Sequence, residues 1–316
     1  MGSPGFAVFV LAAFVPSLAA QSPPAAKPAA VTLSGYLQAR EIWQADIGLT
    51  ASINRARLAA AGTVAPAVTY RLQAEFRTGS VGTGKASVSL QDAYIRFARA
   101  SWALQAGQFK TPFAREFVLS LTDLESADRA TVVDSLSPKR DVGLMGEYSL
   151  AKRVTAYAGV FNGEGQNLTA NRDSTVLGVA RLVVRPVPHL SVGLNAARYF
   201  GDSTRYGADA GYDDERLTLR AEYLAQARDA LSGDDDFGWY ALGAYQPRPE
   251  IQLVFKYESF ERPAVSVALT NRAWTAGANL FPFGRSTRLT LEYVSRAVGD
   301  PGDRQGTLLA QAQVRY

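Results

Sequence analysis

The chain has 316 residues, of which 47% are hydrophobic and 20% charged, with a formal net charge of +4. It has no cysteine, which excludes disulfide bonds and thiolate metal sites, and its one histidine, His189, leaves little scope for a metal centre or a Ser-His-Asp triad. No cofactor is expected. After the first twenty residues, no apolar run reaches the ~18 residues that a transmembrane helix requires.

The N-terminus has the composition of a targeting segment. Gly5–Ala20 is a short apolar stretch that ends in small residues, as in a signal peptide cleaved after Ala19 or Ala20. No Lys or Arg precedes it, which departs from the usual pattern, and a buried apolar helix is the alternative. Residues 21–30 are rich in Pro and Ala, which predicts a flexible tether. Residues 1–20 are therefore assigned to a signal peptide, 21–30 to a tether and 31–316 to one domain.

From Val31 onward, apolar and polar residues alternate with the period of a β-strand. In Val68–Arg77, for example, the apolar residues occupy every second position. About sixteen such segments of ~10 residues follow one another, which is the length of a tilted strand that crosses a bilayer. They begin near Val31, Ile53, Ala67, Ser87, Trp102, Lys139, Arg153, Ser174, His189, Thr204, Glu215, Phe237, Ile251, Arg272, Thr287 and Thr307.

The connections between these segments alternate in length. Short ones with Pro or Gly are Gly62–Pro66, Arg185–Pro188, Gln246–Pro249 and Pro282–Arg285. Longer polar ones are Trp43–Thr50, Thr78–Ala86, Lys110–Pro138, Gly163–Asp173, Asp229–Asp236 and Arg262–Thr270. Short turns on one side and long loops on the other are typical of outer-membrane barrels, and closure removes the strand edges that lipid cannot hydrate. The predicted fold is an all-β transmembrane antiparallel barrel of about sixteen strands.

Aromatic residues gather near the predicted strand ends, where an interfacial girdle is expected. They are Trp43, Trp102, Phe109, Tyr148, Phe161, Tyr199, Phe200, Trp239, Tyr240, Phe260, Trp274, Phe281 and Phe283.

If the apolar phase of each strand faces lipid, the polar phase lines the lumen, and its basic residues outnumber its acids. The basic residues are Arg55, Arg57, Arg71, Arg77, Arg96, Arg216, Arg220, Arg228, Lys256, Arg272, Arg288, Arg296 and Arg315. The acids are Glu75, Asp92, Asp141, Glu147, Glu222, Glu258 and Glu292. A basic, low-dielectric channel attracts anions. The alternative is that these arginines are paired with the acids and with loop carbonyls, and only fill the lumen.

Six fragments in order resemble the phosphate-selective porin O and P family. They are INRARLAAAG from Ile53, YRLQAEF from Tyr70, LQDAYIRF from Leu90, AGQFKTPF from Ala106, RDVG from Arg140 and GVFNG from Gly159. The resemblance is good from about Ile53 to Gly163 and weaker afterwards. It implies a trimeric barrel of about sixteen strands, whose long third loop, here Lys110–Pro138, folds inward to constrict the pore.

The same resemblance implies a constriction lined with Arg and Lys that bind anions. Motif positions that match are Arg55, Arg57 and Asp92, together with Lys110 after GQF, and Arg115 falls in the inward loop. With the lumen-facing Arg71 and Arg96, they form the candidate anion-binding set, in which Asp92 is the counter-charge. Two features depart from the family: the mature chain is short, and Ala56 separates the two arginines of NRAR.

These observations predict a bacterial outer-membrane porin that passes small anions, with phosphate or polyphosphate as candidates. A general diffusion porin with little ionic preference remains open, as does an outer-membrane adhesin or enzyme scaffold, although one histidine argues against an enzyme. Expected partners are small anions, two further copies of the chain, and lipid with lipopolysaccharide. The acidic run Asp234–Asp236 is interpreted as a solvated loop, or else as a divalent-cation site among lipopolysaccharide headgroups.

Overall fold

The computed structural model describes residues 30–77, 86–168, 170–171, 174–229, 231–263, 269–299 and 302–316. The predicted signal peptide and all of the tether except Ala30 lie outside these residues, as does the predicted loop Thr78–Ala86 apart from Ala86. The strands are β1 (Thr32–Gln44), β2 (Gly48–Ala65), β3 (Val68–Arg77), β4 (Ser87–Arg99), β5 (Trp102–Lys110), β6 (Arg140–Leu150), β7 (Val154–Phe161), β8 (Leu177–Val184), β9 (Leu190–Tyr199), β10 (Ser203–Asp213), β11 (Leu217–Arg228), β12 (Leu231–Arg248), β13 (Ile251–Arg262), β14 (Leu269–Leu280), β15 (Pro282–Arg285), β16 (Thr287–Val298) and β17 (Arg304–Arg315). Two short helices, α1 (Arg115–Val118) and α2 (Thr131–Leu136), lie between β5 and β6.

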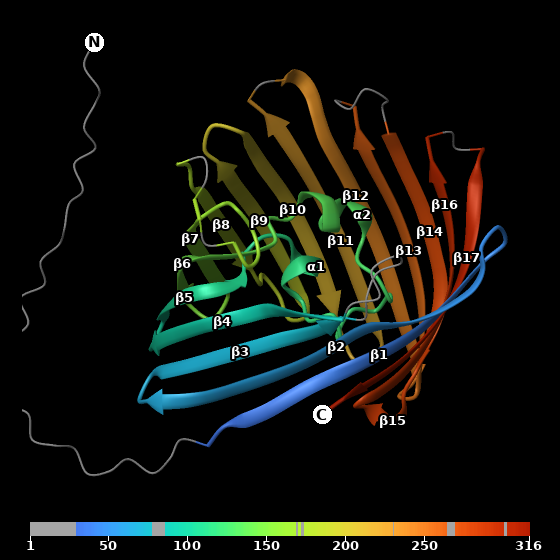
Figure 1. Cartoon of the computed structure of the whole chain (residues 1–316), viewed down its shortest axis with the longest axis horizontal. Helices are drawn as coiled ribbons and strands as arrows, with labels where there is room; N and C mark the ends of the chain where they lie inside the picture. Colours follow the sequence, from blue (N-terminus) through green and yellow to red (C-terminus); the bar gives the residue numbers. More distant parts are fainter. Residues whose placement is uncertain are drawn as a thin grey trace, which may run out of the picture.

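Across the described residues, 16 of these strands form one closed antiparallel barrel, and β15 is a short addition beside β16 (Figure 1). Neighbours in the sequence pair with each other, and β1 closes the ring against β17. Gly35 and Tyr316 exchange two backbone hydrogen bonds of 3.1 Å, so both ends of the barrel chain meet on one side. The predicted barrel of about sixteen strands is confirmed. None of the described helices has the length and apolarity to cross a membrane.

Most strands begin within three residues of the predicted position, but β2 begins at Gly48 and β12 at Leu231. The predicted long connections Trp43–Thr50 and Asp229–Asp236 are therefore wrong, because the strands continue through most of both segments. Asp236, the last residue of the acidic run Asp234–Asp236, belongs to β12. Asp236 is buried, pairs with Arg228 and lies 3.4 Å from Nε of Arg262, so it belongs neither to a solvated loop nor to a cation site.

The alternation in the sequence corresponds to an outer apolar face and an inner polar face. On β16, Leu289, Leu291 and Tyr293 are exposed, whereas Arg288 and Glu292 are buried inside the barrel. This arrangement is the reverse of a soluble sheet packed on an apolar core, and it suits a wall that contacts lipid.

Only part of the predicted aromatic girdle is on the outer face. Trp43, Trp102, Tyr148, Phe200 and Phe283 are exposed near strand ends, as predicted, whereas Trp239 is exposed in the middle of β12. The prediction is wrong for four residues that point inward and belong to the buried apolar cluster, because a loop inside the barrel gives them a partner. They are Phe109, Phe161, Tyr240 and Phe260.

Candidate functional site

The 29-residue connection between β5 and β6, residues 111–139, enters the barrel and is called the inward loop below (Figure 1). Its apolar side chains Phe113, Phe117, Val132, Val133 and Leu136 are buried. They share one apolar cluster with wall residues, and α2 contacts β11, β12 and β13. The loop is inside because its own apolar residues find an apolar surface there. The predicted inward fold of the third loop is confirmed.

Two carboxylates of the wall hold the backbone of the inward loop. Glu222 on β11 accepts hydrogen bonds of 2.6 Å from the N–H groups of Arg115 and Glu116, at the start of α1, and one of 2.8 Å from the hydroxyl of Tyr240. Glu292 on β16 accepts one of 3.0 Å from the N–H of Ala127. Backbone donors that the short helix leaves unpaired are thereby satisfied by the wall.

Cationic and amide groups of the wall hold the loop carbonyl oxygens. Lys256 donates to the carbonyl oxygen of Asp128 at 2.8 Å, and Asn279 donates to that of Glu125 at 2.7 Å. Arg40 donates to the Asp128 carboxylate at 2.8 Å. These contacts place the far part of the inward loop against β11–β17 and β1.

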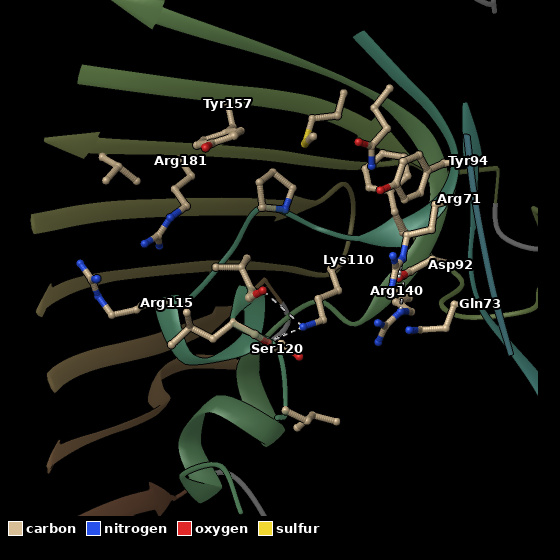
Figure 2. A pocket seen from close by; sticks show the side chains of 18 of the residues that line it. Arg71, Gln73, Asp92, Tyr94, Lys110, Arg115, Ser120, Arg140, Tyr157 and Arg181 are labelled. Carbon is tan, nitrogen blue, oxygen red and sulfur yellow. Dashed lines mark hydrogen bonds and ion pairs between the residues drawn. The ribbon is translucent and has the colours of Figure 1, made fainter. Parts of the chain in front are cut away.

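A cavity of about 470 Å³ lies on the opposite side, between the inward loop and the inner faces of β1–β9 (Figure 2). Among the residues that the structure describes, its lining contains seven cationic residues: Arg57, Arg71, Lys110, Arg115, Arg140, Arg181 and Arg185. Asp92 is the one carboxylate residue in that lining. Because all seven side chains meet at one space, the cavity is the candidate functional site.

Five of the seven residues proposed from the sequence meet here, namely Arg57, Arg71, Asp92, Lys110 and Arg115. The other two do not line the cavity. Arg55 lies next to a bulge in β2, at which Asn54 also turns inward and donates to Gln38 at 3.1 Å. Arg96 pairs with Glu147 at 2.9 Å.

Three lining cations were absent from the sequence-based set, namely Arg140, Arg181 and Arg185. Arg140 opens the RDVG motif, which was a usable signal. Arg181 had none, since the inward face of β8 that it shares with Leu177 and Val179 is otherwise apolar.

Four arginines of the cavity form two groups, in each of which two arginines pair with one aspartate. Asp92 lies 3.5 Å from Nε of Arg71 and 2.8 Å from Nε of Arg140. Asp209 on β10 lies 2.8 Å from Arg115 and 2.7 Å from Arg181. Each group, called below the Asp92 triad and the Asp209 triad, has two guanidinium charges and one carboxylate. Each therefore carries a net charge of about +1 at neutral pH.

Two of the carboxylates that pair with cavity arginines are more deeply buried than those arginines. The side chain of Asp209 is 0% exposed, and that of Glu75, which pairs with Arg57, is 2% exposed. Pairing of lumen arginines, the alternative considered from the sequence, is therefore real. It does not neutralise the cavity, because the described lining holds seven cationic residues and one carboxylate, Asp92.

Lys110, at the end of β5, is held without a carboxylate. Its ammonium donates to the carbonyl oxygens of Val118 at 3.3 Å and Leu119 at 2.6 Å (Figure 2). Among the described residues it makes no ion pair. Two carbonyl oxygens therefore hold the ammonium at the cavity.

Within α1, burial raises the pKa of the Glu116 carboxyl to about 8, while Lys256 lowers it and Glu222 raises it further. Glu116 accepts a hydrogen bond of 2.8 Å from the N–H of Ala130, which links the two helices of the inward loop. This part of the loop is therefore packed around a carboxyl group that is largely neutral at pH 7.

Residues 44–199 match the family model described as phosphate-selective porin O and P. The resemblance to this porin family is confirmed. The match covers the inward loop and most of the strands that line the cavity. Together with the closed barrel, it supports an outer-membrane channel rather than an enzyme.

Solved structures with the same fold come from several bacterial outer-membrane proteins. The channel DcaP of Acinetobacter baumannii is 14% identical with a TM-score of 0.68, and covers 91% of this chain and 97% of its own. OmpT of Vibrio cholerae is 12% identical with a TM-score of 0.70, over 92% and 98%. An anion-selective porin from Comamonas acidovorans is 13% identical with a TM-score of 0.67, over 91% and 100%. Among curated proteins, no sequence matches the chain.

Proposed function

We propose that this porin lets small anions, phosphate among them, diffuse passively across the outer membrane. The observation that carries the proposal is the charge of the cavity, whose lining holds seven cationic residues and one carboxylate among the described residues. Between low-dielectric walls, such an excess attracts anions and repels cations. The family description, phosphate-selective porin, supports the same direction, and one protein of similar fold is described as anion-selective.

The roles of individual residues follow from their positions. Arg57, Arg71, Lys110 and Arg115 are proposed to contact the anion, because they line the cavity, and Asp92 is proposed to orient two arginines. Arginine offers a planar set of donors that matches phosphate and carboxylate oxygens. Arg55 and Arg96 are proposed to add positive potential elsewhere in the lumen rather than direct contacts.

The test is the zero-current potential of the purified protein in a planar bilayer under a KCl gradient, followed by titration with phosphate. An anion-selective potential, with chloride current blocked by phosphate, is expected. General diffusion is the second candidate, because both triads partly neutralise their arginines. An unselective potential without block would establish that candidate instead.

A charge-reversed variant, Arg57→Glu with Arg71→Glu, ties the result to the cavity. We expect its potential to move towards cation selectivity. The control is Arg248→Glu, an exposed residue at the end of β12 that lies outside the cavity lining. Equal shifts in both variants would locate the selectivity outside the cavity.

Export and assembly are part of the proposal. Residues 1–20 are proposed to be removed on export, which mass spectrometry of the membrane-extracted protein would test. We also propose a homotrimer embedded in lipid and lipopolysaccharide; one OmpT structure of Vibrio cholerae is described as a trimer form. Light scattering in detergent tests the stoichiometry, and a monomeric mass would reject the trimer.

A further inference from the structure

The two triads lie on opposite sides of one cavity. In Figure 2, Arg71, Asp92 and Arg140 are together on one side, and Arg115 and Arg181 are on the other. Different parts of the fold supply them. The Asp92 triad comes from β3, β4 and β6, whereas the Asp209 triad joins the inward loop to β8 and β10.

Both triads have donors left for a ligand. Arg140 donates from Nε to Asp92, and its two terminal nitrogens donate to no described residue. Arg115 uses Nε for Asp209 and Nη2 for the carbonyl oxygen of Ser191, which leaves Nη1 without an acceptor among the described residues. All four arginines of the triads belong to the cavity lining. Guanidinium groups that a carboxylate holds in place, with N–H groups that donate to no other described residue, are prepared for carboxylate or phosphate oxygens.

Part of the cavity lining is apolar. It includes Tyr94, Phe109, Pro112, Met145, Tyr157 and Val183, beside the polar Gln73 and Gln105. Lys110 projects between the triads with its ammonium on two carbonyl oxygens (Figure 2). A fully hydrated inorganic anion gains nothing from aromatic rings, a thioether and a proline, whereas a hydrocarbon segment does.

We propose that the cavity binds organic dianions whose two anionic groups are separated by a short apolar spacer, one group at each triad and the spacer against the apolar surface. The α,ω-dicarboxylates are the simplest members of this class. The proposal rests on the anion channel proposed above and names the substrate class of the same site. Two charge-assisted contacts held at a fixed separation select for the distance between the anionic groups as well as for total charge.

The first experiment uses the wild-type protein in planar bilayers, with malonate, succinate, glutarate and adipate as blockers of chloride current. Butyrate and phosphate are the comparisons. We expect one dicarboxylate length to block at a concentration about tenfold lower than butyrate and phosphate, with weaker block by shorter and longer members. Phosphate carries nearly the same charge as a dicarboxylate at pH 7.5. A difference in block between them therefore reports the separation of the anionic groups rather than the total charge.

Removal of either triad removes one end of the site. In Arg140→Gln and in Arg181→Gln we expect the dicarboxylate advantage to vanish, while block by butyrate changes by about twofold or less, because the other triad still accepts a carboxylate. Arg248→Gln, outside the cavity lining, is the matched control and is expected to keep the advantage. The length series needs no variant, so a variant that fails to fold leaves the test intact.

The outcomes separate this inference from the proposed function. If the wild-type protein is anion-selective and blocked by phosphate, but no dicarboxylate is better than phosphate at any length, the dianion site is rejected and the anion channel stands. If the channel shows no ionic preference and no anion blocks it, both are rejected.

Discussion

Arg115 of the inward loop lies 2.8 Å from the carboxylate of Asp209 on β10, so one ion pair joins the loop to the barrel wall beside the cavity. The same carboxylate lies 2.7 Å from Arg181. Asp209 therefore fixes two cavity cations at once. Its side chain is 0% exposed, and the two guanidinium groups provide the pairing that a buried carboxylate requires.

The variant Asp209→Asn is expected to increase anion selectivity and to lower stability. It leaves two guanidinium charges with no carboxylate, so the lumen gains one net positive charge. Loss of one partner from a buried ion pair costs about 3–5 kcal/mol. Zero-current potentials and thermal unfolding of the folded barrel measure the two effects, and a potential that moves towards cations would refute the pairing described here.

The absence of a side chain at Gly211 leaves space for Arg115. A Cβ at this position would lie 2.8 Å from Nη1 of Arg115. In Gly211→Ala we expect the guanidinium to move and phosphate block to weaken several-fold. The loss of stability should be smaller than in Asp209→Asn, because Arg181 still pairs with Asp209. The control is Gly243→Ala, where the nearest atom to a new Cβ would be 3.7 Å away. Equal block in both variants would show that the position of Arg115 is unimportant.

The barrel was predictable from the sequence because period-two alternation and strand length are local properties. The outer loops were less predictable. At Asp236 a polar residue looked like loop, yet it is buried beside Arg228, and only the neighbouring strand reveals that partner. Strand ends beyond the membrane carry polar residues on their inner face just as loops do.

The site was predictable where a motif or the lumen phase marked a residue, as for Arg57 and Lys110. It was not predictable where the inward loop packs against the wall and the inner face of a strand is therefore apolar. On β8, Leu177, Val179 and Arg181 share the inner face, so the alternation of polarity is lost. Which cations share one space depends on where the loop packs, and that depends on contacts between residues far apart in the sequence.

Glu222 is predicted to hold the inward loop in place. In Glu222→Ala, the N–H groups of Arg115 and Glu116 lose their acceptor, and an unsatisfied buried donor costs about 1–3 kcal/mol. We expect larger fluctuations of the open-channel current, because α1 is released at its start. Tyr240→Phe removes one hydrogen bond to the same carboxylate and should cost about 1 kcal/mol, with smaller fluctuations. Single-channel recordings of both variants test this order.

The last prediction concerns pH and Glu116, whose pKa burial raises from 4.5 to about 8. A raised pKa means that the packed loop prefers the neutral carboxyl. Its contribution to stability is complete below pH 4.5 and is lost as the pH rises through about 8, at up to about 1.4 kcal/mol per pH unit between these values. Nearby Lys256 reduces this effect and Glu222 strengthens it.

We therefore expect the inward loop to loosen as the pH rises from 4.5 to about 8, seen as increased current fluctuation and faster cleavage of the loop by an added protease. In Glu116→Gln the side chain stays neutral at every pH, so both signals should depend less on pH over this range. The amide also keeps an oxygen that accepts the N–H of Ala130, so packing is largely preserved. A Glu116→Gln protein with the pH dependence of the wild type would show that another group controls the loop.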